Sequence, residues 1–214
     1  MYKKKPFFIV FEGVEGSGKS FQSKKLFNKL RKKNIKSILT REPGGTESAE
    51  LIRNLILKDY FNKSKKEKFD KYTDTLLYLA ARNEHVQNKI LKAKNNKKIL
   101  ICDRFIDSTI AYQVFGKKVE INLINNIHKY ILKKVKPDIT FLLTVKSSKA
   151  FSRLKKRRYK NRYDKFSRKF YENTQRAFIK TAKKNKSKHY ILDNSKDESS
   201  LQKEIFEIVL SKLK

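Results

Sequence analysis

Residues 7–20 read FFIVFEGVEGSGKS. The apolar run that opens this stretch is typical of a buried strand, and the residues after it match the pattern G-x-x-x-x-G-K-[ST]. Glycines at these positions let backbone N–H groups turn inward around phosphate oxygens, and the dipole of the following helix adds to the attraction. The stretch therefore predicts a strand, a phosphate-binding loop (the P-loop) and a helix.

The P-loop supplies the candidate ligands of a nucleoside triphosphate. They are Gly13, Val14, Glu15, Gly16, Ser17, Gly18, Lys19 and Ser20. We expect Lys19 to reach the β- and γ-phosphates and Ser20 to offer its hydroxyl to Mg²⁺. The alternative is a glycine-rich turn with an exposed lysine, which the flanking strand and helix disfavour.

Outward from the P-loop, strand-like and helix-like segments alternate along the chain. The predicted strands are residues 6–11, 35–40, 98–102, 137–145 and 189–193. The predicted helices are residues 21–33, 47–57, 72–94, 121–134, 170–184 and 200–213, with a further helical segment from Ser147 onward. Strands that alternate with helices predict a parallel, doubly wound α/β sheet.

Two of the predicted helices carry apolar stripes that we expect to face the core, because their residues recur at helical spacing. In the segment 47–57 the stripe is Leu51, Ile52, Leu55 and Ile56. In the segment 72–94 it is Leu76, Leu79, Ala80 and Val86.

Length and composition fit one domain over residues 1–214. One cysteine and three histidines without ligand spacing exclude a disulfide framework and a cysteine-based zinc site. No apolar run approaches the roughly 18 residues of a membrane span. The basic start MYKKK precedes only a short apolar run, unlike a signal peptide. We therefore expect a cytoplasmic protein without a membrane partner.

The formal net charge is +33, from 54 Lys and Arg against 21 Asp and Glu. Eleven of the basic residues are Arg and 43 are Lys, and the lysines are spread along the whole sequence. Abundant Lys, Asn and Ile is the pattern of AT-rich codon usage, so we attribute most of the excess to compositional drift on solvated faces. A positive field that attracts polyanions is the alternative. A nucleic-acid-binding ATPase would need an acidic pair and a continuous basic groove, and the sequence shows neither; we expect no specific nucleic-acid partner.

Two features that follow predicted strands indicate transfer of a phosphoryl group to a phosphorylated acceptor. The third strand is followed by Asp103 and Arg104. An Asp beside the P-loop can hold Mg²⁺ or its waters, and an Arg can make a two-pronged contact with a second phosphate. The second strand is followed by Arg41 and a Pro-Gly-Gly turn, with Arg53 one helix later. This segment is either an acceptor-binding loop or an ordinary turn.

Two further patterns involve arginine. Tyr78 and Arg82 are four residues apart and share one helix face, where they could stack on and hydrogen-bond a base; core packing of Tyr78 is the alternative. Residues 149–169 contain 11 Lys and Arg. Arginine suits sites that contact phosphate, although a solvated loop or an RNA-binding arm would have the same composition.

In order along the chain, these segments resemble the bacterial thymidylate kinases, a family of P-loop nucleoside monophosphate kinases. The resemblance covers essentially the whole chain and rests on FIVFEGVEGSGKS, TREPGGTESAELIR, LLYLAARNEHV, ICDRFIDSTIAYQ, PDITFLLTV and NRYDKFSRKFYENTQRAF. It implies a five-stranded parallel sheet wrapped by helices, the fold of P-loop nucleoside triphosphate hydrolases. It also implies transfer of the γ-phosphoryl of ATP to dTMP with Mg²⁺, giving ADP and dTDP for dTTP synthesis and DNA replication, in a homodimer. Another nucleotide kinase, acting on a different monophosphate or on a nucleoside, is the alternative.

The resemblance implies roles for the residues at the donor side. Lys19 and its loop would hold the ATP phosphates, and Glu15 would lie near the 3′-hydroxyl of the acceptor and the metal site. Ser20 and Asp103 would hold Mg²⁺, in part through its water shell. Arg104 would hold the phosphate of dTMP.

The resemblance also implies the acceptor contacts. Tyr78 would stack on thymine, Arg82 would hydrogen-bond the base, and Tyr112 would press against the sugar and disfavour a 2′-hydroxyl. The other residues that would border the acceptor are Arg41, Arg53, Ser108, Thr109 and Gln113.

Three positions depart from the family pattern. Tyr78 stands where the family usually has Phe, so its hydroxyl needs a partner. The LID, the basic segment of residues 149–169, usually contains Asp-Arg and here has Asn before Arg162. Glu15 stands where one class has a catalytic Arg in the P-loop, so the chain resembles the class whose LID supplies that Arg. We predict Arg162 for this role, and after it Arg153.

Overall fold

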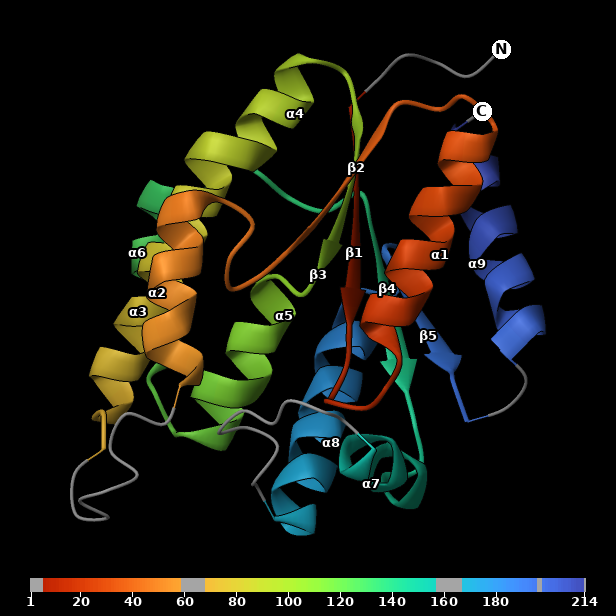
Figure 1. Ribbon diagram of the computed structural model, residues 1–214. Coiled ribbons are helices and arrows are strands. Elements are labelled where there is room, and N and C mark those ends of the chain that lie inside the picture. Colours follow the sequence, from red (N-terminus) through yellow and green to blue (C-terminus); the bar gives the residue numbers. More distant parts are fainter. Residues whose placement is uncertain (1–5, 59–67, 157–166, 196–197, 214) are drawn as a thin grey trace.

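The computed structural model describes residues 6–58, 68–156, 167–195 and 198–213. Its centre is a 5-stranded sheet in the order β2-β3-β1-β4-β5, in which all neighbouring strands are parallel (Figure 1). The strands are β1 (Phe7–Glu12), β2 (Ser37–Arg41), β3 (Ile99–Asp103), β4 (Ile139–Thr144) and β5 (His189–Asp193). The predicted parallel α/β sheet is confirmed, and every strand begins and ends within two residues of its predicted bounds.

The central strands are buried along almost their whole length because helices cover both faces of the sheet. β1 (FFIVFE) and β4 (ITFLLT) are buried almost throughout, whereas the edge strands β2 and β5 are only partly buried. In register, Val10 of β1 lies between Cys102 of β3 and Thr140 of β4. Near-complete burial of mostly apolar strands is typical of parallel strands that are covered on both faces.

The helices follow the strands in the alternation that the sequence predicts. They are α1 (Lys19–Lys32), α2 (Glu47–Leu57), α3 (Lys71–His85), α4 (Leu91–Asn95), α5 (Ile106–Thr109), α6 (Ile121–Ile131), α7 (Ser147–Lys155), α8 (Arg168–Lys184) and α9 (Glu198–Leu213). Two π-helical segments, η1 (Val86–Ile90) and η2 (Ile110–Gly116), join α3 to α4 and continue α5. The predicted helix 72–94 therefore runs from 71 to 95 through a π-helical turn, and the helix at 106–116 was not predicted.

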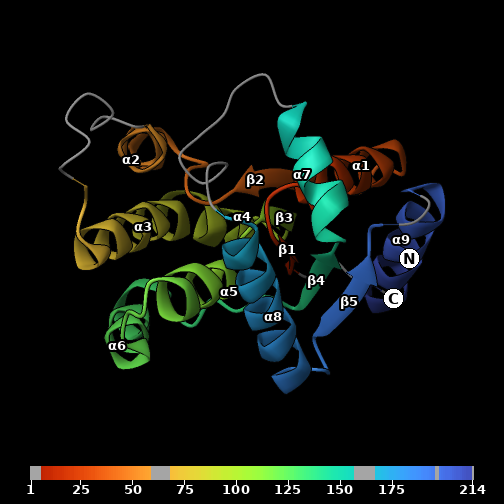
Figure 2. The ribbon, with the colours of Figure 1, turned by 90° about the horizontal axis from the view of Figure 1, so that it is seen from below.

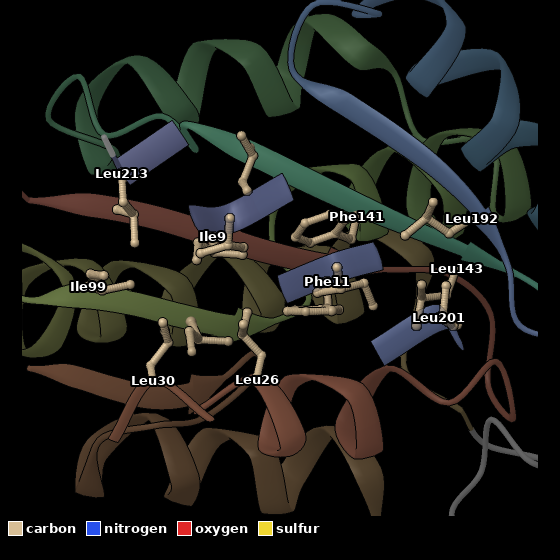
Figure 3. Close-up of a cluster of buried hydrophobic side chains, with 14 residues drawn as sticks. Ile9, Phe11, Leu26, Leu30, Ile99, Phe141, Leu143, Leu192, Leu201 and Leu213 are labelled. Atoms are coloured by element: carbon tan, nitrogen blue, oxygen red, sulfur yellow. The ribbon is translucent and has the colours of Figure 1, made fainter. Parts of the chain in front are cut away.

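α1 and α9 cover one face of the sheet. Leu30 of α1 and Leu201 of α9 belong to the same buried cluster as Phe11 and Phe141 of the sheet (Figure 3). On the opposite face, η1 and α4 pack against Phe8 and its neighbours. None of the helices in the described residues is long and apolar enough to cross a membrane.

The predicted core faces of α2 and α3 are wrong in part. Ile56 and Leu79 are buried as expected, but Leu51 is 70% exposed, and Leu55 and Leu76 are exposed as well. The reason is that α2 and α3 pack against each other beside the sheet (Figure 2), so each helix buries a narrower stripe than its apolar residues cover.

The buried side of α3 also contains polar residues. Asp74, Thr75, Arg82 and His85 are all buried, whereas Ala80, which was predicted to face the core, is exposed. Buried polar groups need partners, and burial of four of them on one helix face places a polar network beneath it.

Candidate active site

A cavity of about 390 Å³ opens at the carboxyl ends of β1, β2 and β3. Nearly all of the predicted site residues in the described part of the chain line it; the exceptions are Gly13, Val14 and Ser17 of the P-loop. Residues from the P-loop, the second strand and its turn, α3, α5 and α7 thus meet around one space. Parallel strands bring these distant segments together because their carboxyl ends share one edge.

The P-loop has the backbone that its glycines allow. Gly13 has φ 137°, and a Cβ there would lie 2.4 Å from the carbonyl oxygen of Leu143, so only glycine fits. The Lys19 ammonium donates to the carbonyl oxygen of Val14 at 2.8 Å. Burial, reinforced by the Arg104 charge, lowers the pKa of Lys19 to about 8. Lys19 is therefore still protonated at neutral pH, within a loop that offers a cation to a phosphate.

Ser20 and Asp103 form the predicted metal pair. The Ser20 hydroxyl donates to the Asp103 carboxylate. The other carboxylate oxygen, Oδ1, is buried and has no hydrogen-bond partner among the described residues. A hydroxyl and a carboxylate oxygen suit Mg²⁺, which keeps several waters and substrate phosphates as its other ligands. The described residues hold no group of three or more His, Cys, Asp or Glu that could bind a metal unaided, so these two residues fit Mg²⁺ that arrives with a nucleotide.

Arg104 follows β3 with a left-handed backbone, φ 76°. Its guanidinium donates to Glu15 at 2.7 Å, to the carbonyl oxygen of Gly13 at 3.0 Å and to the Ser108 hydroxyl at 3.1 Å. The neighbouring carboxylates and Tyr112 outweigh the effect of burial and raise its pKa well above the usual value. Arg104 is thus a fixed cation at the junction of the P-loop and the acceptor-side residues.

Glu15 joins Arg104 to the predicted sugar contact. The Tyr112 hydroxyl donates to the second Glu15 oxygen, and the Tyr112 ring packs edge-on against Phe178. Burial and the Glu15 carboxylate raise the pKa of Tyr112 well above its usual value. The phenol therefore stays a hydrogen-bond donor, and its ring forms a rigid wall of the cavity.

Glu12 is a buried carboxyl group that the sequence did not single out. Its oxygens accept hydrogen bonds from the backbone N–H of Phe105 at 2.7 Å and from the Ser108 hydroxyl at 2.6 Å. Burial, together with the negative charge of Asp107, raises its pKa to about 7. Glu12 fixes the turn that follows Arg104, and its place at the end of β1 was the signal that could have identified it.

Arg82 lies in the cavity wall with most of its donors already used. It donates to Glu42 at 2.8 Å, to the carbonyl oxygen of Phe105 at 2.8 Å and to Thr109 at 2.8 Å. A further contact, at 2.9 Å, joins it to His128. A guanidinium has five N–H donors, so one has no partner among the described residues and is available to a ligand. The guanidinium plane is thus held rigidly in one orientation.

The partners of Arg82 form a buried network beneath α3. His85 contacts Glu42 at 2.9 Å and Thr40 at 2.8 Å. Arg82 and His85 outweigh the burial of Glu42 and lower its pKa. Burial and the Arg82 charge lower the pKa of His128 to about 3, so this imidazole is neutral and accepts from Arg82. Glu42 lies within the REPGGT segment and His85 lies three residues after Arg82, which were usable signals; nothing in the sequence connects His128 to the site.

Two other predicted acceptor residues line the cavity near the Pro-Gly-Gly turn. Arg41 pairs with Glu50 at 3.0 Å, and Arg53 donates to the carbonyl oxygen of Pro43 at 2.5 Å.

Gln113 is 1% exposed, and its side-chain N–H₂ has no partner among the described residues. A buried donor without a partner is costly, and Gln113 lines the cavity, so a ligand acceptor there would satisfy it.

Arg153 of the LID reaches the P-loop. Its guanidinium donates to the carbonyl oxygen of Gly16 at 3.0 Å and to that of Asn194 at 3.3 Å. Asn194, directly after β5, in turn donates to the carbonyl oxygen of Ser17 at 2.6 Å. Sequence analysis missed Asn194, although its place after a predicted strand was a signal. Arg162, the first choice for the catalytic arginine, lies outside the described residues, as do the others of residues 157–166.

The strand–loop–helix unit, the Ser20–Asp103 pair and the arginine-lined cavity define a P-loop protein of the nucleotide kinase class. The family model for thymidylate kinase matches residues 11–205. The chain therefore belongs to the thymidylate kinase family, and the fold is that of P-loop nucleoside triphosphate hydrolases. It is a kinase, a nucleotide-binding transferase of dTDP biosynthesis, as the resemblance implied.

Similar proteins agree over almost the whole chain. A thymidylate kinase of Wolbachia pipientis subsp. Culex pipiens (strain wPip) is 39% identical over 211 residues, which are 97% of each chain. One of Mycoplasma capricolum subsp. capricolum is 36% identical over 209 residues, 97% of this chain and 96% of the relative. The crystal structure of thymidylate kinase from Ehrlichia chaffeensis matches with a TM-score of 0.75 at 33% identity, over 96% of this chain and 99% of that one.

Proposed function

We propose that this cavity is where the chain phosphorylates dTMP to dTDP with ATP. The observation that carries the proposal is that the P-loop and the predicted acceptor residues line one continuous space. A phosphate donor and a phosphorylated acceptor held there would lie within reach of each other. Phosphoryl transfer needs little beyond such positioning and fixed positive charge.

At the donor side, Lys19 and the P-loop N–H groups bind the ATP phosphates. Ser20 and Asp103 would hold Mg²⁺, in part through water, and the bound ion supplies charge that offsets the negative phosphate oxygens. Glu15 is an acidic residue at the position where one class of the family has a catalytic arginine, so it cannot supply that positive charge. Its contacts with Arg104 and Tyr112 support a role near the acceptor sugar instead.

At the acceptor side, Arg104 holds the dTMP phosphate, and Arg41 and Arg53 border the pocket. Tyr78 stacks on thymine, and the N–H of Arg82 that has no partner among the described residues is available to the base. The remaining polar contacts to the base edge come from Ser108, Thr109 and Gln113. Tyr112, with its ring packed and its hydroxyl on Glu15, leaves little room for a ribose 2′-hydroxyl.

The arginine that stabilises the transferred phosphoryl comes from the LID in this proposal. Arg162 remains the first choice, and Arg153 the second. The hydrogen bond of Arg153 to Gly16 supports a position close to the donor phosphates. In this proposal, residues 149–169 are the LID of a single domain that spans residues 1–214, and the family match over residues 11–205 supports treating the chain as one unit.

A homodimer is part of the proposal. Exposed apolar side chains lie on α2, α3 and α6, which lie near one another at one side of the molecule (Figure 2). They are Leu51, Leu55, Tyr72, Leu76 and Ile121. An exposed apolar group of this kind marks a protein–protein interface. A cytoplasmic location completes the proposal; the single cysteine, Cys102, is unpaired and buried, as suits a reducing compartment.

A coupled ADP-release assay with each nucleoside monophosphate tests the proposed reaction. We expect dTMP to be the best acceptor, dUMP a poorer one, and ribonucleotides poorer still. Lys19→Met, which keeps the side-chain length and removes the cation, is the matched negative control. Preference for a purine or cytidine monophosphate would overturn the assignment of the acceptor.

A further inference from the structure

Four turns at the amino ends of the strands carry a dense group of lysines. Three lie in each of residues 32–36, 94–98 and 133–138, and four lie in residues 183–188. These turns lead into β2, β3, β4 and β5. Because the strands are parallel, all four turns lie at the amino ends of the strands, where the strand arrows start in Figure 1. The candidate active site lies at the opposite, carboxyl ends of the strands. We name them the amino-edge turns.

The amino-edge turns contain one acidic residue, Asp138, which accepts a hydrogen bond from the backbone N–H of Phe8 at 2.7 Å. The lysines are Lys32, Lys33, Lys36, Lys94, Lys97, Lys98, Lys133, Lys134, Lys136, Lys183, Lys184, Lys186 and Lys188. Eleven of these thirteen are exposed, and none forms an ion pair with an acidic residue in the described part of the chain. Lysines that are spread along the sequence thus gather on one surface.

Lysines near the negative carboxyl ends of helices are favourable, but this interaction explains only a small part of the lysine cluster. α1, α4, α6 and α8 finish at this edge, and each helix end carries about half a negative elementary charge, or about two charges together. Thirteen lysines exceed that several-fold. In addition, Lys97, Lys133 and Lys134 have φ of 50°, 50° and 63°, a conformation in which glycine is the favoured residue at a helix end. Lysine is therefore present even where the backbone favours another residue.

We propose that the amino-edge turns bind the sugar–phosphate backbone of a nucleic acid without reading its sequence. Five strands about 4.8 Å apart make this edge about 20 Å long, and a row of cations fits a linear polyanion. Lysine ammonium groups are point charges that bind phosphate from many directions. They therefore position a backbone and do not specify bases. Tyr130, in the last turn of α6 directly before residues 133–138, is 80% exposed and offers a ring on which a base can stack.

This surface is separate from the candidate active site. Strands of five or six residues place the two edges about 15–20 Å apart. The proposal does not depend on dTMP being the acceptor, and kinase activity can be measured independently of nucleic-acid binding. The expectation of no sequence-specific nucleic-acid partner is unaffected.

Fluorescence anisotropy with a labelled DNA strand of mixed sequence, about 30 nucleotides long, tests the proposal across a salt series. The edge variant carries Lys33→Gln, Lys36→Gln, Lys136→Gln and Lys186→Gln together. The matched control carries Lys24→Gln, Lys68→Gln, Lys118→Gln and Lys203→Gln, which lie outside the amino-edge turns, the LID and the cavity lining and remove the same net charge. Both variants should keep the wild-type kinase activity and thermal midpoint, which shows that they are folded.

We expect the edge variant to bind at least about tenfold more weakly at about 50 mM salt, with a salt slope shallower by about 3. The control should change affinity less than about twofold. Equal weakening in both variants would overturn the proposal, because binding would then follow net charge alone. Tighter binding to phosphatidylserine vesicles than to DNA at the same salt would overturn the choice of partner.

Discussion

Arg104→Lys is the substitution that most sharply separates geometry from charge at the site. The Arg104 guanidinium donates to Glu15 from one terminal nitrogen, at 2.7 Å. Its other terminal nitrogen donates to the carbonyl oxygen of Gly13 at 3.0 Å and to the Ser108 hydroxyl at 3.1 Å. A lysine ammonium has the same charge but a single nitrogen with three donors. It cannot reach both sides of this arrangement and also make a two-pronged contact with the dTMP phosphate.

The structure sets the size of the expected loss. Replacing the fork by a point charge removes at least one charge-assisted hydrogen bond in a buried setting, worth about 1.5–3 kcal/mol. At about 1.4 kcal/mol for each factor of ten, kcat/KM for dTMP should fall by about 10- to 100-fold. KM for dTMP should rise and kcat should fall, because the phosphate would be both weakly held and misplaced. KM for ATP should stay within about twofold.

Steady-state kinetics with each substrate varied in turn measures these changes. Arg31→Lys is the matched control, because Arg31 is exposed on α1 and does not line the cavity. If Arg104→Lys leaves both kcat and KM for dTMP at the wild-type values, Arg104 serves the structure of the loop and does not hold the acceptor phosphate.

The remaining predictions concern the LID, a buried carboxyl group and acceptor selectivity. Arg162→Ala should lower kcat by roughly 10³ with little change in dTMP affinity, and normal kcat in both Arg162→Ala and Arg153→Ala would reject an arginine from the LID. The native pKa of Glu12, about 7, lies above its ordinary value of 4.5, so the native state binds the extra proton between these values. The unfolding free energy should therefore fall as pH rises from about 4.5 to about 7, and urea unfolding of Glu12→Gln should lack this component of the slope. Removal of the thymine methyl should cost about 1–3 kcal/mol in kcat/KM, measured with dUMP; equal kcat/KM for dTMP and UMP would contradict the sugar contact of Tyr112.

The sequence is a good guide to the sheet because the signals for it are local. Each strand is a short apolar run bounded by polar residues, and the strand bounds differ from the observed ones by at most two residues. The segment 106–116 was missed because the α-helix α5 has only 4 residues, too few to show a helical period, and the π-helical segment that follows does not have the α-helical period.

The exposed face of α2 shows where periodicity fails. Leu51 and Ile56 belong to one helical stripe in the sequence, yet Leu51 is 70% exposed and Ile56 is fully buried. A stripe identifies the apolar side of a helix but does not say whether the sheet, a neighbouring helix or a second subunit covers it. That distinction depends on how α2 and α3 pack, which is a property of the tertiary structure.

The candidate site likewise has a part that the sequence predicts and a part that depends on the tertiary structure. The residues that line the cavity could be predicted because they lie in motifs with fixed spacing, such as Lys19 in the P-loop and Arg104 after β3. The residues that hold them in place could not, because their partners come from distant segments. Arg82 contacts His128 across 46 positions in the sequence, and Asn194 contacts Ser17 across 177. Such pairs become visible only when the fold brings their elements together.

The most direct measurement of the central claim is the quantity of dTDP formed from dTMP and ATP by the purified chain. Chromatographic separation of the nucleotides should show dTDP and ADP appearing in equal amounts, with dependence on Mg²⁺. Lys19→Met should abolish both products while the protein remains folded. ADP released without an equal amount of dTDP would contradict the account, because the cavity would then hydrolyse ATP or serve another acceptor.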